Sequence, residues 1–185
     1  MVQKIPFTDY IKLAFTLVMM WATLVTLTDG PFPFLINIDL VFHEAGHVFF
    51  LFFGSLIHAL GGTLMQIIIP TTLAGYFILR REFYSASVLT WWLGENFVNI
   101  SVYIKDARAR QLNLIGGGGH DWAYILGKLN LLEHDILIGN IAYSIGAVIM
   151  VASVIGAIYF TAKNVKEKEK EKRKKIKTIL QDGDF

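Results

Sequence analysis

Five long apolar segments constrain the fold of this chain more than any other feature. They cover residues 10–27, 36–53 with an extension to residue 60, 63–79, 83–104 and 136–160. A helix rises about 1.5 Å per residue, so about 20 apolar residues cross a hydrocarbon layer about 30 Å thick. Because 54% of the residues are hydrophobic, a lipid bilayer is expected to be part of the solvent. The sequence predicts an all-α fold, a polytopic membrane helix bundle of about five transmembrane helices.

The end of the chain differs from the rest in its charge. Lys and Glu alternate from Lys166 to Lys172, and nine of the 17 Lys and Arg residues lie between Lys163 and Lys177. We expect residues 1–162 to form one transmembrane domain and residues 163–185 a charged tail. Positively charged segments favour the cytoplasmic side of a membrane. The tail is therefore expected in the cytoplasm, and five spans would place the N-terminus on the opposite face.

Several classes of site are excluded by composition. The chain has no cysteine, so a metal would have to be bound by His and carboxylate side chains. There is no phosphate-binding loop of the G-x-x-x-x-G-K type, so we expect no nucleotide. No aromatic residues are interleaved with the charges of the tail, so we expect no nucleic acid as a partner. The lipid bilayer is the first expected partner.

The second apolar segment contains the sequence His43-Glu44-Ala45-Gly46-His47. On a helix, two residues four positions apart differ by about 40° around the axis, so both imidazoles can reach one metal ion. In the H-E-x-x-H pattern of zinc peptidases, the Glu next to the first His acts as a general base toward water. Ionisable residues inside a membrane span are costly and are usually functional. Gly46 leaves room for a neighbouring helix to approach closely.

This sequence resembles the site-two protease family of intramembrane zinc metalloproteases, in which an H-E-x-x-H inside a transmembrane helix provides two zinc ligands. The resemblance covers residues 43–47 and the multi-span setting, and implies zinc ligands at His43 and His47 and a catalytic Glu44. Residues 94–109, GENFVNISVYIKDARA, and His120-Asp121-Trp122 are also similar to blocks in uncharacterised bacterial membrane proteins that carry H-E-x-x-H. The localisation that this implies is a bacterial cytoplasmic (inner) membrane.

The third metal ligand is not given by that resemblance, because the Asn-Pro-Asp-Gly or Leu-Asp-Gly sequence that carries it in the family is missing here. Two regions compete. His120 and Asp121 follow the glycine run 116–119, and a His-Asp pair can provide one ligand and one residue that orients a ligand. Glu95 lies inside the fourth segment, where an unpaired carboxylate is costly. We rank Asp121 and His120 above Glu95, and expect the glycine-rich segment to start on the face opposite the HEAGH end and to re-enter the bilayer.

Two functions follow from these residues. The first is an intramembrane zinc metalloprotease that hydrolyses peptide bonds of membrane-associated substrates. The alternative is a non-proteolytic metal-binding scaffold subunit of a larger membrane complex, since the chain has no separate substrate-binding domain. Zinc is the expected cofactor in either case.

Overall fold

The fold of the chain is helical throughout the part that the computed structural model describes, residues 7–112 and 119–182. Within these described residues, six α-helices and two short 3-10 helices follow one another: α1 (Phe7–Asp29), α2 (Pro33–Phe49), η1 (Leu51–Phe53), α3 (Ser55–Leu79), α4 (Phe83–Lys105), α5 (Asp121–Lys128), η2 (Leu132–His134) and α6 (Asp135–Asp182). The prediction of an all-α fold is confirmed for these residues. Residues 116–118 of the glycine run lie outside them.

In the part of the chain that the structure describes, three helical segments are long and apolar enough to cross a membrane: Thr8–Asp29, Ser55–Leu79 and Leu132–Lys174. They correspond to α1, α3 and most of α6. Many large apolar side chains on these helices are exposed, as expected for helices that face lipid. Helix α2 has only 17 residues, and α4 carries the buried polar residues Glu95 and Asn96.

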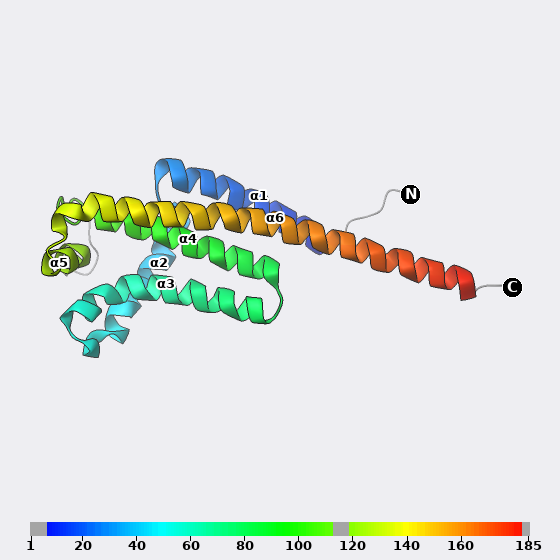
Figure 1. The fold of residues 1–185 in the computed structure, drawn as a ribbon, viewed down its shortest axis with the longest axis horizontal. Helices are drawn as coiled ribbons and strands as arrows, with labels where there is room; N and C mark the ends of the chain where they lie inside the picture. The colour runs from blue at the N-terminus through cyan, green and yellow to red at the C-terminus, as the bar shows by residue number, and fades with distance from the viewer. Residues whose placement is uncertain (1–6, 113–118, 183–185) are drawn as a thin grey trace.

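Helices α1, α3, α4 and α6 lie along the long axis of the molecule, and α2 passes obliquely between the end of α1 and the start of α3 (Figure 1). Helices α4 and α6 are in backbone contact, because a Cβ atom on Gly94 would lie 2.8 Å from the Gly146 carbonyl oxygen. Small residues at such crossings let membrane helices approach closely. A cluster of buried side chains from α1, α4 and α6 packs around this crossing, and it consists of Met19, Ala22, Trp91, Val98, Met150, Val154 and Ala157.

The turn between α1 and α2 lies about midway along the length of the bundle and not at one of its ends (Figure 1). The backbone N–H of Phe32 in this turn donates to Glu95 Oε1 at 3.1 Å, and Glu95 is near the centre of α4. The end of α1 is at a similar depth, since its Leu27 carbonyl accepts a hydrogen bond from Tyr143 of α6. Gly30 has a φ of 103°, which glycine adopts at little cost. Helices α1 and α2 together therefore make one interrupted passage through the bundle.

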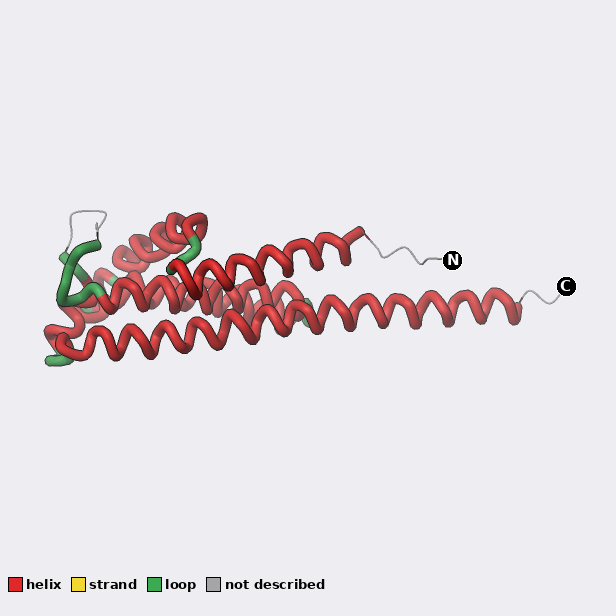
Figure 2. The backbone as a smooth tube through the Cα atoms, turned by 90° about the horizontal axis from the view of Figure 1, so that it is seen from above, coloured by secondary structure: helices red, strands yellow, loops and turns green. Residues whose placement is uncertain are grey.

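The start of α1 and the charged part of α6 lie at the same end of the molecule (Figures 1 and 2). Lys168 Nζ lies 2.8 Å from Asp9 Oδ1. The expectation of termini on opposite faces was wrong, because it counted α2 as a separate crossing. The chain instead passes along the bundle four times, through α1 with α2, then α3, α4 and α6.

Candidate metal centre

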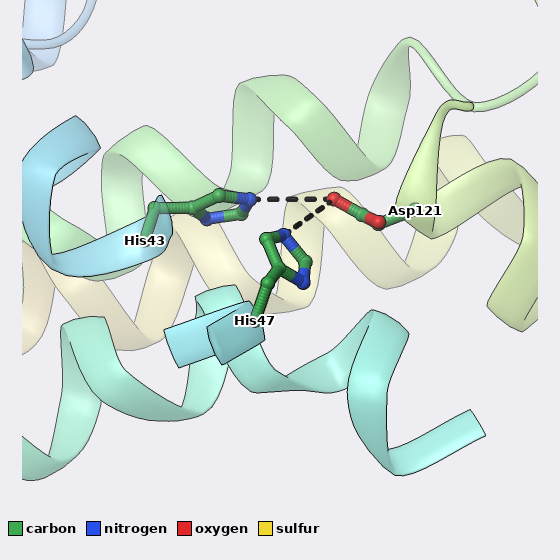
Figure 3. A group of neighbouring side chains, drawn as sticks. All are labelled: His43, His47 and Asp121. Atoms are coloured by element: carbon green, nitrogen blue, oxygen red, sulfur yellow. Dashed lines mark hydrogen bonds and ion pairs between the residues drawn. The ribbon is translucent and has the colours of Figure 1, made fainter. Parts of the chain in front are cut away.

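His43 and His47 from α2 meet Asp121 from α5 at the end of the bundle opposite the charged tail (Figures 1 and 3). One potential ligand atom from each of these residues lies within 4.8 Å of the other two. Asp121 Oδ2 is 3.3 Å from His43 Nε2 and 3.3 Å from His47 Nε2. The two imidazoles therefore converge on one carboxylate oxygen, as their four-residue spacing predicts for a helix.

The two separations that involve Asp121 fit the ligands of a tetrahedral zinc ion. Zinc bonds to His nitrogen and carboxylate oxygen of about 2.0 to 2.1 Å place neighbouring ligand atoms about 3.3 to 3.4 Å apart. The 3.3 Å separations between Asp121 Oδ2 and the two Nε2 atoms match this distance between neighbouring ligand atoms. They are longer than the usual N–H···O distance of about 2.9 Å. Two imidazoles and one carboxylate are also a ligand set that zinc commonly uses, with further positions left for water or substrate.

The opposite nitrogen of each imidazole is held by a hydrogen-bond acceptor. His43 Nδ1 is 3.0 Å from Gln66 Oε1, and His47 Nδ1 is 2.8 Å from the carbonyl oxygen of His58, both on α3. An acceptor at Nδ1 favours the tautomer that carries the proton there. The Nε2 atoms that face Asp121 are then free to bind a metal. Such outer contacts are typical of metal-binding His residues.

Glycines allow α2 to lie close enough to α3 for these contacts. A Cβ atom on Gly46 would overlap the carbonyl of Gly61, and one on Gly62 would overlap the imidazole of His43. The expected close approach at Gly46 is therefore confirmed. The His43 ring lies directly against the backbone of α3 at Gly62.

Asp121 is the first residue of α5, and three groups hold this helix start in place. Tyr103 of α4 donates its hydroxyl to Asp121 Oδ2 at 3.2 Å and accepts the Asp121 backbone N–H at 3.0 Å. His120 is the N-cap, and its Nδ1 accepts the N–H of Ala123. On its other side, His120 Nε2 lies 3.3 Å from Asp106 Oδ2. The residues just after α4 are thus tied to the start of α5.

The carboxyl group of Asp121 is suited to remain ionised. Burial would raise its pKa, but hydrogen bonds from His43 and His47, and the charge of these imidazoles when they are protonated, outweigh burial in the metal-free chain, so that the pKa lies below its ordinary value. Burial lowers the pKa of His120 even though Asp106 acts in the opposite direction. Asp121 thus offers an anionic oxygen and His120 a mainly neutral imidazole near neutral pH.

Of the three candidates for the third metal ligand, one lies with the two histidines and two do not. Asp121 lies with His43 and His47, whereas His120 points to Asp106, and Glu95 lies beside Asp39 deeper in the bundle. The expectation that the loop after α4 starts on the face opposite the HEAGH end was wrong. Helices α3 and α4 run in opposite directions, so α4 returns to the end where α3 begins (Figure 1). The end of α4 and the start of α5 therefore both lie at the end of the bundle that holds the histidines.

Glu44 is exposed and lies close enough to His47 and Tyr103 for its charge to act on both. The contacts of Gln66, Tyr103 and Asp39 were not predicted from the sequence. A polar residue inside an apolar segment was the available signal for Gln66 and Asp39. Tyr103 carried no comparable signal.

Comparisons of the chain with protein-family models, curated proteins and solved structures found no match.

Proposed function

We propose that this chain is an intramembrane zinc metallopeptidase that hydrolyses peptide bonds of membrane-associated proteins. The observation that carries the proposal is the convergence of His43, His47 and Asp121, with ligand atoms within 4.8 Å of one another. These side chains are 11%, 18% and 20% exposed, respectively. A substrate approaching the end of the bundle can therefore reach them.

Each residue has a distinct role in this proposal. His43, His47 and Asp121 hold the metal, and Gln66, the His58 carbonyl and Tyr103 orient these three ligands. Zinc, when bound, supplies Lewis-acid activation of water and of the peptide carbonyl. Glu44 accepts a proton from the attacking water and passes it to the leaving amine.

The distribution of charge supports one orientation in the membrane. The end that carries the tail also carries Lys12 and the turn with Arg80 and Arg81, since Tyr84 at the start of α4 donates to the Lys12 carbonyl. Clustered Lys and Arg residues favour the cytoplasm. We therefore place the tail in the cytoplasm, with four passages across the bilayer in place of the five expected from sequence. The metal centre then lies toward the non-cytoplasmic face.

The test compares wild type with Glu44→Gln. Glutamine keeps the size of the side chain but cannot accept the proton, so the variant is expected to retain one zinc per chain and to lose cleavage. Loss of a general base commonly lowers the rate by about 100- to 10,000-fold. Zinc is measured by elemental analysis of purified protein. Cleavage is measured by quantifying full-length membrane proteins in cells that express either form.

The matched control is Glu82→Gln, which changes an exposed carboxylate at the opposite end of the bundle. It is expected to retain both zinc and cleavage. Zinc in both wild type and Glu44→Gln, with no membrane protein that accumulates only in the variant, would contradict proteolysis and favour the metal-binding scaffold. Wild-type protein without zinc would remove both functions.

A further inference from the structure

A second cluster of polar side chains lies inside the bundle, where α4 passes the turn between α1 and α2. Asp39 of α2 and Glu95 and Asn96 of α4 are each 0% exposed. The Asp39 carboxyl has the side chains of Glu95, Trp92, Asn96 and Asn99 as neighbours, and of these Trp92 is hydrogen-bonded to it. Asp39 is one helical turn before His43, but neither Asp39 nor Glu95 belongs to the group formed by His43, His47 and Asp121.

Each carboxyl group has one oxygen that accepts a hydrogen bond. Trp92 Nε1 donates to Asp39 Oδ1 at 2.8 Å, and the Phe32 backbone N–H donates to Glu95 Oε1 at 3.1 Å. The Phe32 N–H lies at the N-terminus of α2, where the helix dipole favours negative charge. Donors of this kind stabilise the ionised form of a carboxyl group.

Three oxygen atoms of the cluster have no hydrogen-bond partner: Asp39 Oδ2, Glu95 Oε2 and Asn96 Oδ1. The orientation of the Asn96 amide is fixed, because its Nδ2 donates to the Trp92 carbonyl at 3.1 Å. Its oxygen is therefore a fully buried acceptor without a hydrogen-bond partner. Buried acceptors without a donor are costly, and three in one cluster call for a common partner.

We propose that Asp39, Glu95 and Asn96 bind a hard divalent cation of the Ca²⁺ or Mg²⁺ class. Two neighbouring carboxylates inside an apolar bundle require compensation of two negative charges. A single proton shared between the two carboxyls compensates one charge and leaves Asn96 Oδ1 unsatisfied. A divalent cation compensates both charges and is a partner for all three oxygens. An oxygen-only ligand set is typical of Ca²⁺ and Mg²⁺, in contrast to the nitrogen-rich centre at His43 and His47.

The consequence of this site is a connection between the interrupted passage and α4. The cation joins α2 to α4 beside the Phe32 turn, one helical turn before His43. Interrupted helices whose ends and side chains bind cations within the membrane are known in transporters. Here the cation fixes the start of the helix that carries the HEAGH sequence, and the inference stands independently of proteolysis.

Terbium luminescence tests the inference, because Tb³⁺ binds oxygen ligands as Ca²⁺ does and is sensitised by a nearby tryptophan. Trp92 is hydrogen-bonded to Asp39, so the full-length protein in detergent is expected to give tryptophan-sensitised Tb³⁺ emission that Ca²⁺ displaces. Asp39→Asn and Glu95→Gln are each expected to weaken Tb³⁺ binding by about tenfold or more. Calcium and magnesium contents of the purified protein then identify the resident ion.

Two controls separate this site from others. Glu133→Gln removes an exposed carboxylate at the bundle end and should leave Tb³⁺ binding unchanged, as should the His43→Ala, His47→Ala double variant. Trp92→Phe should abolish most of the sensitised emission, and this readout applies even where Asp39→Asn or Glu95→Gln does not fold. Emission that persists in Trp92→Phe, or wild-type protein that neither contains a divalent cation nor binds Tb³⁺, overturns the proposal and leaves a protonated carboxyl pair.

Discussion

At the scale of single residues, the candidate centre was predictable where ligands lie close in sequence. The four-residue spacing of His43 and His47 fixes their common direction on a helix. Asp121 could be ranked above Glu95 as the third metal ligand, but the sequence could not decide between them, because the answer depends on which loop meets which helix. Asp121 reaches the histidines through Tyr103 and the α5 start, contacts that no local pattern encodes.

Substitution of the candidate third ligands separates ligation from positioning. Asp121→Ala is expected to lower zinc affinity by at least about 100-fold, since it removes one of three ligands. His120→Ala should lower it less, because His120 contacts Asp106 and the α5 backbone. Glu95→Gln should keep zinc bound. Equilibrium zinc titration of the purified variants measures the zinc affinity of each. Loss of zinc in Glu95→Gln alone would place the third ligand in α4.

At the scale of elements, the sequence predicted the helices better than their lengths and directions. Four of the five apolar segments correspond to α1, α3, α4 and α6. The second corresponds to a shorter, oblique helix, because Gly30 and the following prolines end α1 in the middle of the bundle. The apolar composition of a segment indicates that it is surrounded by lipid or by other apolar side chains. It does not indicate the depth at which the segment begins, so the turn that interrupts the passage between α1 and α2 was not predicted.

The contact between α2 and α3 provides a test of how helix packing controls the centre. In Gly62→Ala the added methyl group overlaps the His43 imidazole, so that the ring must move and zinc affinity should fall by about tenfold or more. Overpacking of this kind typically costs about 1–3 kcal/mol of stability. Zinc titration and thermal unfolding of the purified protein measure the two effects.

Gly75→Ala is the matched control in the same helix, because a Cβ atom there meets nothing within 4 Å. Alanine favours helix over glycine by up to about 1 kcal/mol, so this variant should retain zinc and be equally or more stable. Equal loss of zinc in both variants would show that the α3 backbone, and not the contact with His43, is responsible.

At the scale of the whole molecule, the number of passages determines which end of the bundle holds the centre. If each of the five apolar segments is one crossing, the number of crossings is odd and the two termini lie on opposite faces of the membrane. The contact between Asp9 and Lys168 shows that the start of α1 and the charged part of α6 lie at the same end of the bundle. That arrangement is possible because α1 and α2 together make a single passage. Five crossings would place Lys12 on the face opposite the tail, whereas four passages place it with Arg80, Arg81 and the tail. Lys105 and Arg108 stay at the opposite end, so the change in the charge distribution concerns Lys12.

The orientation is testable with single cysteines, since the natural chain contains none. Lys128→Cys lies at the end with the metal centre, and Arg80→Cys and Lys172→Cys lie at the tail end; all three positions are exposed. A membrane-impermeant maleimide added to intact cells should label only Lys128→Cys, and the other two should react after permeabilisation. The reverse pattern would place the metal centre on the cytoplasmic side. Labelling of Arg80→Cys and Lys128→Cys from the same side would contradict the passage of α4, because α4 is the long helix that separates these two positions along the chain.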